Sequence, residues 1–105
     1  MILTTTPQIE GKPIAEYIAV VSGEAIIGAN AAKDFMASFR DIVGGRSKSY
    51  EKVIREGKET SLKELAESAE ALGANGVVGI SFSYEAIGTN GSMLMVAATG
   101  TAVRY

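Results

Sequence analysis

The chain has 105 residues and a mass of 10.9 kDa, the size of one ordinary domain. Its net charge of -2 gives no overall attraction to nucleic acid or to anionic lipid, so we expect neither as a partner. The sequence holds no cysteine and no histidine, which excludes disulfides, thiolate metal sites, a cysteine nucleophile and catalysis by histidine. The N-terminus lacks the pattern of a signal peptide, and no apolar run is long enough to span a bilayer, so we expect a cytoplasmic protein.

The N-terminal half predicts two strands and a helix. Ile2–Thr6 is rich in β-branched residues and is followed by a proline, which favours a short strand. Ile14–Ile27 predicts a long second strand, in which Gly23 indicates a bulge or a bend. Apolar residues then recur at helical spacing, which predicts a helix over Ala31–Val43 with Asn30 as its N-cap.

The C-terminal half predicts one long helix and a hairpin. The helix is expected over Ser49–Leu72, with Gly57 weakening its middle. Strands are expected over Val77–Ile87 and Met93–Tyr105, joined by the turn sequence GTNGS. The order β-β-α-α-β-β predicts a single α+β domain over residues 1–105, in which two helices pack on one face of an antiparallel sheet.

Neither face of the predicted hairpin is clearly polar. An antiparallel sheet with one solvated face normally alternates apolar and polar residues, whereas the last two strands carry apolar or small residues on both sides. Two helices cover only one face, and monomers rarely expose large apolar patches, so we expect copies of the chain to cover the other. The alternative is that the first strand and the loops cover it within one chain. Small residues would let a partner's backbone approach closely, and the expected contact residues are Val77, Gly79, Ser81, Leu94, Val96, Ala98 and Gly100.

The sequence GGRS between the two predicted helices has two interpretations. Free backbone N–H groups at a helix start, together with a guanidinium, suit a phosphate or carboxylate. The residues of such an anion site would be Arg40, Gly44, Gly45, Arg46 and Ser47. Phosphate loops usually follow a strand and have a defined glycine spacing, however, and this segment follows a helix. The interpretation that we favour is a connector, in which the glycines end one helix and the serine caps the next.

Four segments resemble a known family: MILTTTPQIEGKPIAEYIAVVSGEAIIGAN, RDIVGGRSKSYEK, ALGANGVVGISFSYEAIG and GSMLMVAATGTAVRY. Together they cover essentially the whole chain, and they resemble the YbjQ-like family. The resemblance implies a domain related in architecture to dodecin subunits and assembled as a ring-shaped pentamer. It also implies heavy-metal binding, the label that the family carries, while the family's biochemical role is otherwise uncharacterised.

The metal label has few residues to support it. Soft metals prefer thiolate, thioether or imidazole ligands, and the only soft donors are four methionines. Met93 and Met95 share a face of the predicted fourth strand, and a ring would bring several copies together in a thioether cluster. The favoured alternative is ordinary packing, since methionine fills irregular gaps in cores and interfaces. A hard-ion site at Glu16, Glu24 or Glu85 has no ligand-loop spacing to support it.

These patterns together favour a binding protein over an enzyme. The main hypothesis is a non-enzymatic homo-oligomer without an obligatory cofactor, which binds a metal ion or a small anion or other ligand at subunit junctions. The first alternative is a purely structural oligomer with no ligand of its own. The second is an enzyme that acts through carboxylates and tyrosines, which remain the available acid–base groups.

Overall fold

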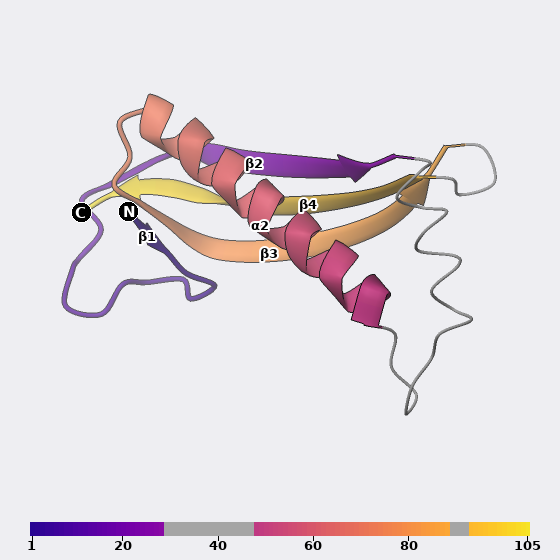
Figure 1. The fold of residues 1–105 in the computed structure, drawn as a ribbon. Coiled ribbons are helices and arrows are strands. Elements are labelled where there is room, and N and C mark those ends of the chain that lie inside the picture. Colours follow the sequence, from indigo (N-terminus) through magenta and orange to yellow (C-terminus); the bar gives the residue numbers. More distant parts are fainter. Residues whose placement is uncertain (29–47, 89–92) are drawn as a thin grey trace.

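The computed structural model describes residues 1–28, 48–88 and 93–105. The helix predicted over Ala31–Val43 lies outside these residues. The described elements are β1 (Ile2–Leu3), β2 (Glu16–Ile27), α2 (Lys48–Ala71), β3 (Gly76–Ile87) and β4 (Met93–Arg104). In Figure 1, α2 crosses the three long strands diagonally on one side of the sheet. The predicted α+β class is confirmed in this form: a small α+β fold with four strands and one described helix.

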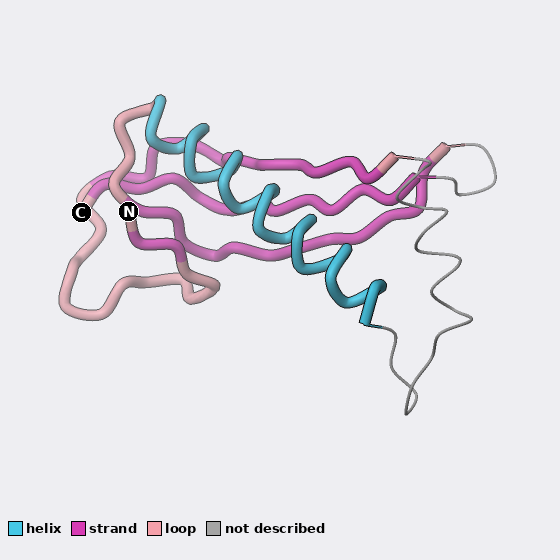
Figure 2. The backbone as a smooth tube through the Cα atoms, in the orientation of Figure 1, coloured by secondary structure: helices cyan, strands magenta, loops and turns pink. Residues whose placement is uncertain are grey.

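The sheet has the strand order β1-β3-β4-β2. As predicted, β3 and β4 form an antiparallel hairpin, and β2 is antiparallel to β4. The prediction of a wholly antiparallel sheet is wrong at β1, which runs parallel to β3 with Ile2 opposite Gly76. The parallel pairing arises because a loop after β1 carries the chain from one edge of the sheet to the other before β2 begins (Figure 2).

The helix α2 is continuous and buries a narrow stripe against the sheet. Its bounds, Lys48–Ala71, agree with the predicted helix to one residue at each end. The buried positions recur at every fourth residue, the spacing that places side chains on one face of a helix. They are Gly57, Ser61, Leu65 and Ala69. All but Leu65 are small, which lets the helix approach the strands closely.

Two glycines set the distance between α2 and the sheet. A Cβ atom at Gly23 of β2 would overlap the carbonyl oxygen of Ser61 and the backbone nitrogen of Leu65. A Cβ atom at Gly57 of α2 would lie 2.8 Å from Cγ2 of Val96 on β4. The expected bulge at Gly23 is therefore wrong, because the register is regular there and shifts instead just after Tyr17. Gly23 is required for close packing of the helix.

Leu65 is the largest side chain in the buried stripe, and it has no exposed surface. Leu65→Ala is expected to lower the free energy of unfolding by about 2–5 kcal/mol, through lost burial and the cavity left behind. Leu72, just beyond the helix, is 51% exposed, so Leu72→Ala is the matched control. Urea denaturation followed by circular dichroism measures both variants. Equal losses of stability would contradict the packing described.

The N-terminal segment covers one end of the sheet face opposite α2. Thr6 and Thr4 accept hydrogen bonds from the N–H groups of Gly79 and Ile80, at 2.9 and 3.1 Å. Gly79 has a φ of 64°, a conformation that favours glycine, and it lies at a register shift in β3. At this end of the face Val78 is 4% exposed. Among the described residues, loops of the same chain therefore cover the second face at this end.

Candidate functional site

The sheet surface that faces away from α2 is the candidate site, and we call it the open face. Three long strands contribute alternate residues to it, because successive side chains in a strand point to opposite sides. Beyond the end covered by the N-terminal segment, β2 provides Val20, Ser22, Glu24 and Ile26, β4 provides Met93, Met95, Ala97 and Thr99, and β3 provides Ser81, Ser83, Glu85 and Ile87. In the part of the chain that the structure describes, no helix lies on this side of the sheet (Figure 1).

The apolar residues of the open face concentrate toward the hairpin end of the strands. Strand register places Met95 between Ile26 and Glu85, in one row across the sheet. The next row toward the hairpin turn pairs Met93 with Ile87. Both methionines are half-buried. This end of the open face therefore combines thioether, aliphatic and carboxylate groups.

A belt of hydroxyl groups crosses the middle of the open face. Ser22, Thr99 and Ser81 lie in one row, and the Oγ atom of Ser81 is 3.2 Å from Oγ1 of Thr99. Short hydroxyl side chains bond to one another and need little water to be satisfied. The open face is thus less apolar than expected from the sequence, both in this row and at Glu24 and Glu85.

The single chain leaves much of the open face wet. Val20 is 82% exposed and Ile26 is 61% exposed, high fractions for aliphatic residues, and both lie on the edge strand β2.

The predicted subunit-contact residues divide between the two faces of the sheet. Val77, Val96 and Ala98 have no exposed surface and lie in the core, and Gly100 is buried with them. For these four the prediction is wrong, because they are covered within the chain itself: Gly57 of α2 packs on Val96, and Val77 and Ile80 pack on Gly100. Leu94 is half-buried and lies on the same side of β4 as Val96. Gly79 and Ser81 are exposed.

The other predicted site residues are placed as follows. The structure brings Met93 and Met95 to the open face, whereas all five residues of the predicted anion site, Arg40, Gly44, Gly45, Arg46 and Ser47, lie outside the described residues. Among the described residues, no three or more Asp, Glu, His or Cys side chains gather closely enough to hold a metal ion. One chain in its described part therefore offers a heavy metal only separate thioethers and carboxylates, a donor set too sparse for tight binding.

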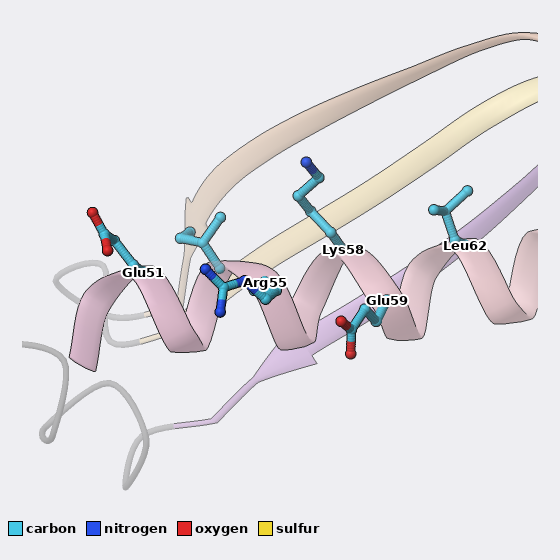
Figure 3. A pocket seen from close by; sticks show the side chains of 6 residues that line it. Glu51, Arg55, Lys58, Glu59 and Leu62 are labelled. Atoms are coloured by element: carbon cyan, nitrogen blue, oxygen red, sulfur yellow. The ribbon is translucent and has the colours of Figure 1, made fainter. Parts of the chain in front are cut away.

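Two hollows flank α2 and were not predicted from the sequence. The first, of about 430 Å³, is lined by Glu51, Ile54, Arg55, Lys58, Glu59 and Leu62. Lys58 and Leu62 project from the same side of the helix (Figure 3), and the Nζ atom of Lys58 lies 5.2 Å from the centre of the Phe82 ring. This contact occupies the Lys58 ammonium with an aromatic face.

The second hollow lies between α2 and β2 and has a volume of about 440 Å³. Its charged lining residues are all acidic: Glu24, Glu56 and Glu64. The Oε2 atom of Glu64 accepts a hydrogen bond of 3.1 Å from the backbone N–H of Glu24. The sequence carried a faint signal of this arrangement, since Glu56 and Glu64 are two helical turns apart and share a side of α2.

Comparison with known proteins places these features in a family. A family model described as "Putative heavy-metal-binding", YbjQ_1, matches residues 1–105. The chain is also similar to the crystal structure of a protein of unknown function from Pediococcus pentosaceus ATCC 25745, which belongs to the DUF74 family. That similarity has a TM-score of 0.55 at 18% sequence identity, and covers 99% of this chain and 96% of the other. Within the described residues, no helix has the length and hydropathy needed to cross a bilayer.

Proposed function

The chain belongs to the YbjQ-like family, and from that premise we propose that it is a non-enzymatic binding protein, which assembles with copies of itself through the open face. The metal ion or small ligand would bind where the copies meet. The absence of histidine and cysteine from the sequence supports a binding role over a catalytic one.

The exposure of Val20 and Ile26 carries this proposal. Burying one such aliphatic side chain contributes about 1.5–3 kcal/mol, so covering both in an assembly would add an amount comparable to a large share of a small domain's stability, before association costs. A second copy is the partner that every chain has available. The hydroxyl belt is compatible with an interface, because interfaces accept hydrogen-bonded polar groups.

The proposed assembly is the ring-shaped pentamer that the family resemblance implies. Its subunits would have a dodecin-like architecture, in which the helix predicted over Ala31–Val43 joins α2 as the second helix. A ring joins its subunits through head-to-tail contacts, in which the open face of one copy would meet a different surface of the next.

The ligand site proposed for the junctions uses Met93 and Met95. One chain supplies two thioethers on the open face, and a ring would multiply them around its axis. Thioether clusters select soft monovalent ions such as Cu(I) and Ag(I). Glu85, beside Met95 in the same row, would add a carboxylate for charge balance.

Replacing both methionines by leucine tests this site. Leucine keeps nearly the same volume and removes the sulfur, so assembly is expected to persist while uptake of Cu(I) or Ag(I) falls at least tenfold. Native mass spectrometry after incubation with each ion measures oligomer mass and bound metal together. Glu85→Gln is the matched control in the same row and should reduce uptake less. Unchanged uptake in the double leucine variant would reject the thioether site.

A purely structural oligomer is the second candidate. It is favoured by the neighbours of the two methionines, because Ile26 and Ile87 lie directly beside them in the register. This is the environment in which methionine serves as a flexible packing residue. A ring that purifies without metal, and whose melting temperature is unchanged across a panel of metals and metabolites, would favour this candidate.

A further inference from the structure

The strand β2 is an edge of the described sheet over its whole length. It has a single neighbour, β4, and its 12 residues make it as long as either central strand. A long free edge presents a row of unpaired backbone groups, and it is a common starting point for unwanted pairing with other chains. Proteins therefore protect such edges, and the described part of β2 contains no proline that would do so.

One of the outward backbone groups of β2 is already occupied. In an antiparallel edge strand, the N–H and C=O groups of one residue both point toward the neighbouring strand. Those of the next residue both point away from it. The Glu24 N–H bonds to Glu64 of α2 at 3.1 Å, so it points away from β4. Ser22 and Ile26 share its orientation, since the register is regular on both sides. Glu64 thus takes the middle one of three successive outward N–H groups.

The position of Glu64 is fixed by the packing beneath it. The backbone of α2 at Ser61 and Leu65 lies directly against Gly23, the residue before Glu24. Glu64 lies between these two helical residues, so its side chain begins beside the strand edge. The packing of α2 on Gly23 fixes the distance between the helix and the strand edge. The Glu64 side chain spans that distance and its carboxylate reaches the Glu24 N–H.

The hollow around the contact is acidic. Glu24, Glu56 and Glu64 all line it. Glu56 has a cationic neighbour in Lys52, whose Nζ atom is 4.0 Å away, whereas Glu64 faces the strand edge. A strand that added to β2 would bring its carbonyl oxygens toward the Glu64 carboxylate and leave that charge without its N–H partner.

We propose that Glu64 closes the β2 edge against strand addition by a second copy of the chain. The contact satisfies a backbone donor and places a negative charge where an incoming carbonyl oxygen would have to lie. Association is thereby directed away from this edge. This inference extends the proposed homo-oligomer by naming a surface that its copies do not use.

Two substitutions at Glu64 and one control test the proposal. Glu64→Ala removes both the hydrogen bond and the charge, while Glu64→Gln keeps an acceptor oxygen. Glu56→Ala removes a carboxylate from the same hollow without touching the strand edge. Amide hydrogen exchange read by NMR reports the Glu24 N–H directly, and light scattering over hours at micromolar concentration reports association beyond the wild-type mass.

Glu64→Ala is expected to speed exchange of the Glu24 amide about tenfold, the loss of one hydrogen bond to a charged acceptor, and to produce species larger than the wild type. Glu64→Gln and Glu56→Ala should both stay close to the wild type in exchange.

A folded Glu64→Ala variant with wild-type exchange, or with faster exchange but wild-type mass, would overturn the proposal. If Glu64→Ala does not fold, Glu64→Ser takes its place, because its side chain is too short to reach the strand edge. Faster exchange with larger species then supports the proposal, and wild-type exchange or wild-type mass overturns it. A monomeric wild type would refute the proposed oligomer and leave this test valid.

Discussion

Gly23→Ala is expected to lower the free energy of unfolding by about 3 kcal/mol or more, enough to unfold much of a marginally stable domain. The added methyl group would overlap the carbonyl oxygen of Ser61 and the backbone nitrogen of Leu65. These are backbone atoms of a helix, so no side-chain rotation can relieve the clash. The helix would have to lift from β2, which would expose the core around Leu65.

The measurement is urea denaturation with circular dichroism. Gly28→Ala is the matched control, because Gly28 follows the same strand and a Cβ atom there would meet nothing within 4 Å. The control should stay within about 0.5 kcal/mol of the wild type, as most surface substitutions do. Equal stability of the two variants would show that α2 does not pack on Gly23 as described.

A double lysine variant of the open face is expected to dissociate the assembly and leave the single chain folded. Val20 and Ile26 are 82% and 61% exposed, so lysine at both positions gives up little burial within the chain. In an assembly, the same positions would lose about 1.5–3 kcal/mol of apolar burial each and gain buried charges. The affinity between copies should fall by at least about a hundredfold.

Sedimentation velocity and circular dichroism together measure this effect. Leu72→Lys is the control, since Leu72 is also exposed, at 51%, but lies at the end of α2 away from the open face. The control should keep the wild-type mass. A double lysine variant that retains the wild-type mass would show that the open face is not the contact, whatever the oligomeric state.

The strands and the long helix were largely predictable from the sequence. Period-two and helical patterns depend on local chemistry, and the bounds of β2, α2, β3 and β4 agree with the predictions within two residues. The parallel pairing of β1 was missed because two hydrogen-bonded residues leave almost no pattern, and their partner lies more than 70 positions along the chain. The pairing of β1 with β3 depends on the path of the loop that follows β1, and this path leaves no pattern in the sequence.

The assignment of the two sheet faces was the main error. Alternation separates Val96 and Ala98 from Met95 and Ala97, but it does not say which set the helix covers. The smaller set was assigned to a partner because small residues permit close approach. Small residues do permit close approach in the structure. The backbone that approaches belongs to α2 of the same chain and not to a partner, since α2 lies against Gly23. The Glu64 contact with the strand edge depends on that same approach.

The oligomeric state of the wild-type chain at low micromolar concentration tests the central claim most directly. The claim is that the exposed aliphatic surface of the sheet is covered by other copies, and static light scattering gives the mass without reference to shape. The account predicts a stable species of about 55 kDa, five times the chain mass of 10.9 kDa. A well-behaved species of 10.9 kDa would contradict it.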